Sequence, residues 1–274
     1  MYIDLLWHGK TIDSVLYNNP NYSRIPSSVQ VDFSKWPVIP NQVRCHLRYD
    51  GNKFIKQSPP YHPNSIPYRL ALIVESPHKD EFSYDFNPLQ PLSSNRGRDF
   101  DSKILTRIKK WNIPNLKKNQ LFEIKIFNPV QYQTSLYHFL SNLIIFDRIQ
   151  KQLPQGFIIP NYGSLWNKHN SLLRNSIWKI LFTNPTFPCE AIFKNELSSY
   201  NPSYIVNACT GSGNPKLKSW HEANQIFSRR PRMPISNYSI HNLKAIVRRS
   251  IFSYFNSTRS GKQYIEEVHP CKWK

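Results

Sequence analysis

The sequence is short of acidic residues, of closely spaced cysteines and of long hydrophobic runs. Its 274 residues include 17 Asp and Glu against 36 Lys and Arg, which gives a formal net charge of +19. A surplus of this size predicts a polyanionic partner, with nucleic acid favoured over a membrane surface. The alternative explanation is a general bias toward Lys, Asn and Ile, such as an AT-rich genome produces.

The four cysteines lie far apart, at positions 45, 189, 209 and 271. None belongs to a Cys-x-x-Cys pair, the close pair that usually presents two sulfurs to one zinc ion or iron–sulfur cluster. We therefore expect reduced thiols, no metal held by cysteine and no cofactor. No Gly-rich phosphate loop follows the first apolar strand, which argues against a nucleotide-sugar or similar small-molecule enzyme.

The most apolar run, near Leu140–Phe146, is too short to span a bilayer. No apolar stretch follows a basic start, so no signal peptide is expected. Hydrophobic residues make up 39% of the chain, which is enough for a sizeable core. These features predict a cytoplasmic protein without membrane contact, and we expect a monomer.

Residues 1–67 differ from the rest of the chain in their high content of Pro, Tyr and Asn. The prolines of this stretch are at positions 20, 26, 37, 40, 59, 60, 63 and 67. Because proline interrupts helices, we expect an irregular arm with short strands, packed on the main domain or on DNA.

Residues 68–274 alternate short apolar runs with stretches of helical periodicity. The runs that favour strands are at 70–74, 121–127, 203–208 and 263–268. The stretches that favour helices begin near 101, 136, 166, 188 and 239. This alternation predicts an α/β domain of three αβα layers around a central, mostly parallel sheet of four strands. A basic insertion is expected at about 210–238.

Polar residues gather where the predicted strands end. Glu75-Ser-Pro-His-Lys-Asp-Glu81 follows the first strand, Asn128-Pro-Val-Gln-Tyr132 the second, and His269-Pro270 the fourth. The third strand carries Asn207, for which structural hydrogen bonds are the simpler expectation. Ligands of open parallel sheets bind beyond the carboxyl ends of the strands, so one crevice could collect these groups.

These motifs resemble the uracil-DNA glycosylase superfamily. One branch of that family has Gln-Asp-Pro-Tyr-His after its first strand, and another has Glu-Ala-Pro-Gly followed shortly by Glu-Asp. Here Glu75-Ser76-Pro77-His78 stands at that point, then Asp80-Glu81. An Asn ends the family's second strand, as Asn128 does, and His-Pro-Ser follows its fourth, where His269-Pro270-Cys271 stands here. The resemblance covers residues 69–274.

The resemblance implies a role for each matching residue. Glu75 would activate water and stabilise the positive sugar, while Ser76 occupies the position where the other branch has its acid. Asn128 would read the edge of a flipped base, and His269 would donate a hydrogen bond to the departing base. Trp273 is the nearest candidate for the side chain that wedges into the duplex. The departures suggest a base other than plain uracil, such as a modified cytosine of phage DNA.

The residues support a DNA-binding interpretation by themselves. Asp80 and Glu81 are rival acids, and Phe127, Tyr132 and His78 are candidates for contacts with the base. Interleaved cations and aromatics suit phosphate contacts with base stacking. The candidate DNA-binding residues are Arg96, Arg98, Lys216, Lys218, Arg229, Arg230, Arg232, Lys272 and Trp273.

Two other functions remain open. A metal-dependent DNA endonuclease also uses acids beside a sheet, and Glu123-Ile-Lys125 on the second strand fits the short part of its Glu-x-Lys pattern. A non-catalytic nucleic-acid-binding protein would explain the charge without any active site. The predicted function is therefore removal of a non-standard base from DNA, with these two as alternatives.

Overall fold

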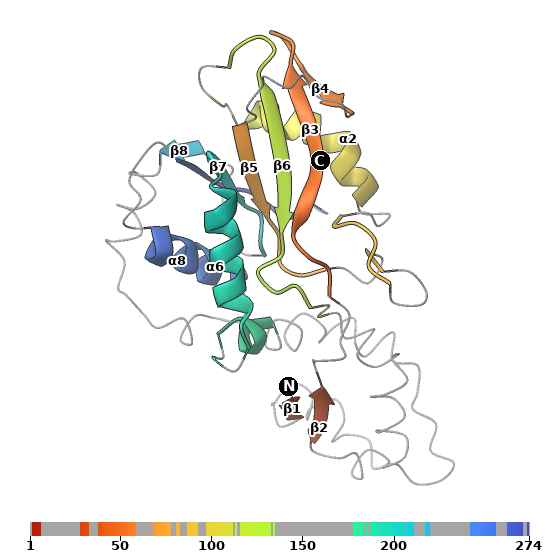
Figure 1. Ribbon diagram of the computed structural model, residues 1–274, viewed down its shortest axis with the longest axis vertical. Helices are drawn as coiled ribbons and strands as arrows, with labels where there is room; N and C mark the ends of the chain where they lie inside the picture. The colour runs from red at the N-terminus through yellow and green to blue at the C-terminus, as the bar shows by residue number, and fades with distance from the viewer. Residues whose placement is uncertain are drawn as a thin grey trace, which may run out of the picture.

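The computed structural model describes seventeen stretches and single residues of the chain. They are residues 2–6, 28–32, 38–58, 68–77, 81–82, 87–92, 97–111, 113, 116–132, 134, 178–183, 185, 187–210, 217–219, 242–255, 262–270 and 273. Within these residues the fold is a seven-stranded mixed sheet with helices on both faces (Figure 1). A separate antiparallel pair is formed by β1 (Tyr2–Leu6) and β2 (Ser28–Asp32).

The main sheet has the strand order β4-β3-β6-β5-β7-β9-β8. The strands are β3 (Gln42–Tyr49), β4 (Phe54–Gln57), β5 (Tyr68–Ile73), β6 (Leu121–Phe127), β7 (Tyr204–Asn207), β8 (Leu217–Ser219) and β9 (Gln263–Glu266). The middle strands β6, β5, β7 and β9 are parallel. The remaining pairs, β3 with β4, β3 with β6, and β8 with β9, are antiparallel.

The prediction of four mostly parallel strands is therefore wrong, because the sheet has three more strands and is mixed. The α/β class is correct. The β3–β4 hairpin comes from the stretch expected to be an irregular arm, and β8 comes from the expected basic insertion. The hairpin turn contains Gly51 at φ 106°, a conformation that glycine adopts at no steric cost. Asp50 Oδ1 accepts hydrogen bonds from the N–H groups of Asn52 and Lys53 at 2.8 and 2.7 Å. Prolines border this hairpin, and they masked its strand pattern in the sequence.

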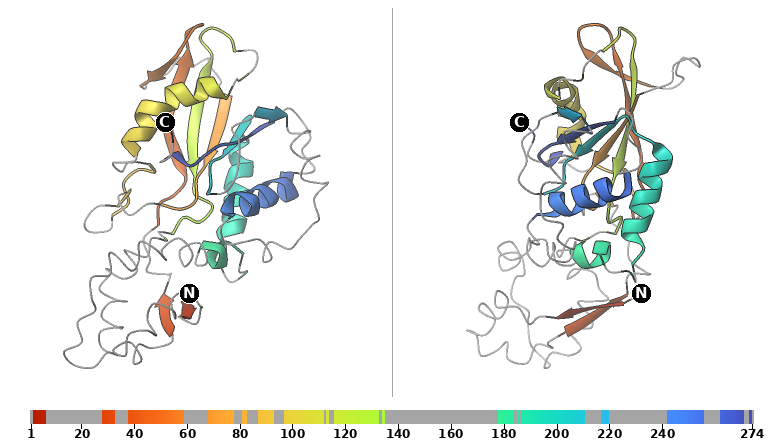
Figure 2. Two further views of the ribbon diagram at one scale, coloured as in Figure 1. Left: turned by 180° about the vertical axis from the view of Figure 1, so that it is seen from behind. Right: turned by 90° about the vertical axis from the view of Figure 1, so that its left-hand side faces the viewer.

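The helices α2 (Gly97–Lys110), α6 (Cys189–Tyr200) and α8 (Leu243–Phe255) lie against the sheet. Figure 2 shows α2 on one side of the sheet and α6 on the other. The side chain of Asn207 bonds to α8 and that of Phe127 contacts α6. Strand register places both residues on the same face, so α8 and α6 share that face.

The core on the α2 side shows why the sequence folds this way. Alternate residues of the middle strands point into it, and α2 contributes Phe100, Ile104 and Ile108 from one stripe. The stripe follows the 3.6-residue period of a helix. The middle strands are buried on both faces, as parallel strands covered by helices are expected to be.

Candidate functional site

The carboxyl ends of β5, β6, β7 and β9 lie at one edge of the sheet, because these neighbouring strands are parallel. Glu75 follows β5 by two residues, and Asn128 follows β6 directly. Asn207 ends β7, and Glu267 follows β9. Ligands of parallel sheets bind at this edge, which makes these residues the candidate site.

Glu75 is held in place by hydrogen bonds to both its side chain and its carbonyl, and only 1% of its surface is exposed. The backbone N–H of Thr210, just after β7, donates to Oε1 of Glu75 at 2.5 Å. The indole Nε1 of Trp178 donates to the Glu75 carbonyl at 2.7 Å. A hydrogen bond to an ionised carboxylate is short and strong, so this acid has one defined position at the edge.

Asn128 is also buried, with 1% of its surface exposed. Its backbone N–H donates to Oδ1 of Asn41 at 2.6 Å. Its side-chain Oδ1 and Nδ2 are both buried, and neither has a hydrogen-bond partner among the described residues. A buried polar atom left unpaired costs about 1–3 kcal/mol, so this amide requires an explanation.

The turns that carry Glu75 and Asn128 are bonded to each other. The N–H of Val74 donates to the carbonyl of Phe127 at 2.9 Å, and the N–H of Val130 lies 3.5 Å from the carbonyl of Glu75. The acid and the unpaired amide therefore belong to one piece of the sheet edge, and neither can shift far without the other.

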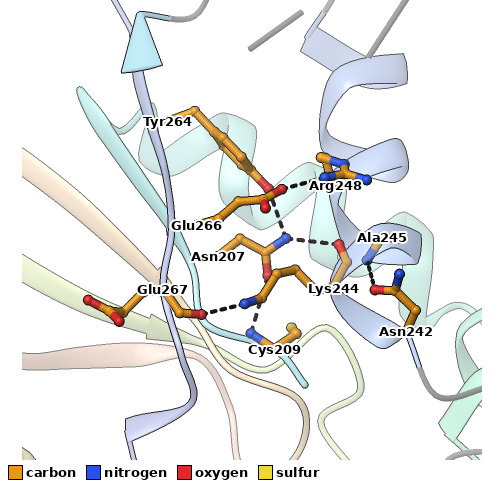
Figure 3. Close-up of polar contacts among 9 residues, drawn as sticks. All are labelled: Asn207, Cys209, Asn242, Lys244, Ala245, Arg248, Tyr264, Glu266 and Glu267. Carbon is orange, nitrogen blue, oxygen red and sulfur yellow. Dashed lines mark hydrogen bonds and ion pairs between the residues drawn. The ribbon is translucent and has the colours of Figure 1, made fainter. Parts of the chain in front are cut away.

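A buried network joins the ends of β7 and β9 to α8 (Figure 3). Asn207 Nδ2 donates to the carbonyl of Lys244 at 3.0 Å and to the hydroxyl of Tyr264 at 2.9 Å. Asn207 Oδ1 accepts the N–H of Cys209 at 3.2 Å. The Lys244 ammonium donates to the carbonyl of Glu267 at 2.6 Å. The expected structural role of Asn207 is confirmed, since both polar atoms of its side chain are bonded within the protein.

The chain after β9 is fixed on both sides of His269. The Glu267 carboxylate accepts hydrogen bonds from Trp111 Nε1 and from the N–H of Val268, each at 2.8 Å. Beyond His269, the indole Nε1 of Trp273 donates back to the carbonyl of Val268 at 2.9 Å. His269 itself is half-buried and lies close after β9 at the same edge.

Two predicted nucleic-acid contacts are corrected by burial. Trp273 is 2% exposed and packs against Phe100 and Trp111, with ring centroids 5.8 and 6.3 Å apart. It is a core residue and cannot wedge into a duplex. Phe127 is fully buried, and its ring meets Tyr200 of α6 at 5.6 Å, so it is not a stacking partner for a base.

Other predicted residues occupy defined positions near the edge. The buried Ser76 hydroxyl hydrogen-bonds to Thr134 Oγ1 at 2.7 Å. Tyr132 is half-buried, its backbone pairs with Val38, and partial burial raises the pKa of its phenol. The rival acid Glu81 is buried.

Several predicted residues cannot be placed at the site. Outside the described residues lie His78, Asp80, Arg96, Lys216, Arg229, Arg230, Arg232 and Lys272. The backbone of Arg98 lies in the first turn of α2, and Lys218 is the middle residue of β8.

The Glu-x-Lys motif of the nuclease alternative lies along β6 rather than at its end. Glu123 Oε2 is 3.2 Å from His46 Nε2, and Lys125 Nζ lies 5.1 Å from the ring centroid of Phe127. Among the described residues no group of three His, Cys, Asp or Glu is arranged to hold a metal ion. Among the described residues, Cys45, Cys189 and Cys209 form no disulfide.

Two residues of the site were not identified from the sequence. Asn41 accepts the Asn128 N–H and donates from Nδ2 to Oε2 of Glu196 at 2.6 Å. Asn41 precedes β3, and Glu196 lies in α6. Only the fold brings them together, and no spacing in the sequence pointed to either.

Comparisons with protein-family models, curated proteins and solved structures find no match to this chain. No helix in the described parts of the chain is long and apolar enough to cross a membrane. The geometry of the sheet edge and the motifs at the strand ends are therefore the features that point to a function.

Proposed function

We propose that this protein is a DNA glycosylase, which hydrolyses the N-glycosidic bond of a flipped, non-standard base and leaves an abasic site. The observation that carries the proposal is the Asn128 amide, which is buried and has no partner for either polar atom among the described residues. The proposal extends the resemblance to the uracil-DNA glycosylase superfamily.

An unpaired amide suits the hydrogen-bonding edge of a pyrimidine. Asn128 offers an acceptor oxygen and a donor NH2 group, and a pyrimidine carries a complementary acceptor and donor on adjacent atoms. A base can present that edge only after it has left the duplex stack. Because Asn128 is 1% exposed, neighbouring side chains must move as the base enters. The two hydrogen bonds that Asn128 forms with the base then offset part of the free energy needed to move those side chains.

Glu75 and His269 supply the charges that the reaction needs. As the bond between C1′ and the base nitrogen breaks, its electron pair stays on the base and positive charge grows on the sugar. The Glu75 carboxylate stabilises that charge, orients a water molecule and takes its proton as the water bonds to C1′. His269 donates a hydrogen bond to the base as negative charge builds on it. Preorganised charges of this kind account for most of the catalysis.

DNA is the partner that fits the charge of +19. We propose a modified cytosine, such as those of phage DNA, as the preferred base, with uracil as the second candidate. This choice follows from the departures from the family motifs, including Ser76 after the acid and Cys271 after His269-Pro270.

The test is base release by purified protein in EDTA. Uracil-containing DNA and DNA with glucosylated hydroxymethylcytosine are incubated with the protein and then heated in alkali, which breaks the strand at abasic sites. We expect breaks only after alkali treatment, on at least one substrate, and none with Glu75→Gln.

Glu123→Gln is the matched control, because it removes the charge of another strand acid that the proposed reaction does not use. It should release base at a rate close to that of the unchanged protein. Direct strand cleavage that requires magnesium, and that Glu123→Gln abolishes, would overturn the glycosylase proposal in favour of the endonuclease.

A further inference from the structure

The turn after β6 is held by one carboxylate of α6. Asn41 Nδ2 donates to Glu196 Oε2 at 2.6 Å, and Gln131 Nε2 lies 3.3 and 3.4 Å from the two carboxylate oxygens. Asn41 Oδ1 accepts the N–H of Asn128 at 2.6 Å. Glu196 is therefore connected to both ends of the four-residue turn from Asn128 to Gln131.

The charge on Glu196 fixes which way the Asn41 amide faces. A carboxylate only accepts hydrogen bonds, so the Asn41 NH2 group must point toward Glu196. The carbonyl oxygen of the same amide then has to point toward the N–H of Asn128. Hydrogen bonds to a charged partner are about twice as strong as neutral ones, which makes the reversed orientation unfavourable.

The residues before β3 hold the same turn from its other side. The N–H of Ile39 donates to the carbonyl of Gln131 at 3.1 Å, and Val38 pairs with Tyr132 as an antiparallel bridge. Asn41 is 8% exposed and Asn128 is 1% exposed, so water has little access to the bond between them. The turn is thus defined by contacts from α6 and from the chain before β3.

We propose that Glu196 and Asn41 form a positioning relay, which sets the orientation of the Asn128 amide and thereby determines which base the site accepts. This inference rests on the proposed function. Neither relay residue contacts the base. The relay acts through the backbone of Asn128, from which the base-reading side chain projects.

The test exchanges the donor and the acceptor between the two relay residues. Asn41→Asp places two carboxylates at a contact of 2.6 Å and removes the donor that Glu196 requires. Adding Glu196→Gln restores a donor, so in the double variant the carboxylate at position 41 can accept from both the Asn128 N–H and the new amide. We expect base release to fall by about 10²-fold in Asn41→Asp, as for other small displacements in active sites. The double variant should recover most of this loss.

Two readouts separate positioning from a merely structural role. The ratio of base-release rates on the two substrate DNAs does not depend on how much protein is folded, and we expect Asn41→Asp to change it by about tenfold. Backbone hydrogen exchange of Asn128, Val130 and Gln131, which needs no activity, should become faster in Asn41→Asp and return toward its original rate in the double variant.

Asn119→Asp is the matched control, because Asn119 accepts a hydrogen bond from Arg48 at the opposite edge of the sheet. It should change neither readout.

Unchanged exchange of Asn128, Val130 and Gln131 in Asn41→Asp would overturn the relay. Faster exchange with an unchanged rate ratio in an active variant would overturn its role in base choice. If the unchanged protein releases no base, the proposed function fails and the role in base choice fails with it, while the exchange data still decide whether the two residues hold the turn.

Discussion

Two buried asparagines lie at the ends of β6 and β7, two parallel strands of the same sheet, and they differ in the hydrogen bonds of their side chains. Asn207, at the end of β7, is bonded to Lys244, Tyr264 and Cys209. Asn128, just after β6, has no partner for its side chain among the described residues. Both are at most 1% exposed.

This difference in hydrogen bonding distinguishes Asn207, a structural amide, from Asn128, whose amide is available to a ligand. Burial removes water from both side chains, so any hydrogen bond must come from the protein or from a bound molecule. The protein satisfies Asn207 completely, whereas Asn128 has no partner among the described residues and lies beside the turn that carries Glu75. We propose that the β5–β6 end of the edge binds the base and that the β7–β9 end supports it.

The largest effect on stability is expected from Asn207→Leu, which keeps the size of the side chain and removes its polar atoms. The Tyr264 hydroxyl, the Lys244 carbonyl and the Cys209 N–H all lose a partner in the interior. Since each such loss costs about 1–3 kcal/mol, the free energy of unfolding should fall by about 3 kcal/mol or more. Urea denaturation followed by tryptophan fluorescence measures it, and a loss below about 1 kcal/mol would contradict the structural assignment.

A smaller effect on stability is expected from Lys244→Met, and the size of this effect depends on pH. Burial lowers the pKa of Lys244 below its ordinary 10.5. Between that lowered pKa and 10.5, the unfolded chain binds one more proton than the folded protein, so stability from this group rises with pH. In that pH window, the free energy of unfolding of the unchanged protein should rise relative to that of Lys244→Met by up to about 1.4 kcal/mol per pH unit.

Denaturation of both proteins at a series of pH values up to 10.5 measures this gain, because the other titrating groups are common to the two. A difference in stability that stays constant as the pH rises would show that burial does not disfavour the charge on Lys244.

The smallest effect on stability is expected from Asn128→Leu. This change removes two buried atoms that have no bonds to lose among the described residues, and the backbone bond to Asn41 remains. The free energy of unfolding should stay within about 1 kcal/mol of the original value or increase. The same urea denaturation measures it, and a loss as large as that of Asn207→Leu would mean that the two asparagines do not differ.

The sequence was sufficient to predict the middle of the sheet. Parallel strands that are buried on both faces appear as continuous apolar runs, and β6 begins and ends at the predicted residues 121 and 127. Short strands were expected within residues 1–67, but β3 and β4 were not located, because they lie between prolines and are less apolar than the middle strands. Glu75 and Asn128 were found because the carboxyl ends of parallel strands share an edge.

The remaining features depend on tertiary contacts that no local pattern records. Trp273 near the chain end gave no sign that it would pack against Trp111 in the core. Asn41 bonds to Asn128, and Glu196 bonds to Asn41. Both lie far from Asn128 in the sequence, and only folding brings them near it. The sequence favoured a structural role for Asn207 and, through the resemblance, base reading for Asn128. The structure adds the hydrogen-bond partners of Asn207, and it shows none for the Asn128 side chain among the described residues.

Asn128→Leu tests most directly whether the Asn128 amide, which has no side-chain partner among the described residues, reads a base. The measurement is the rate of base release in EDTA by equal amounts of folded Asn128→Leu and unchanged protein on the preferred DNA substrate. Loss of preorganised hydrogen bonds in an active site reduces rates by about 10²–10³-fold, and we predict a decrease of that size in a stably folded protein. A variant that releases base as fast as the unchanged protein would contradict the account.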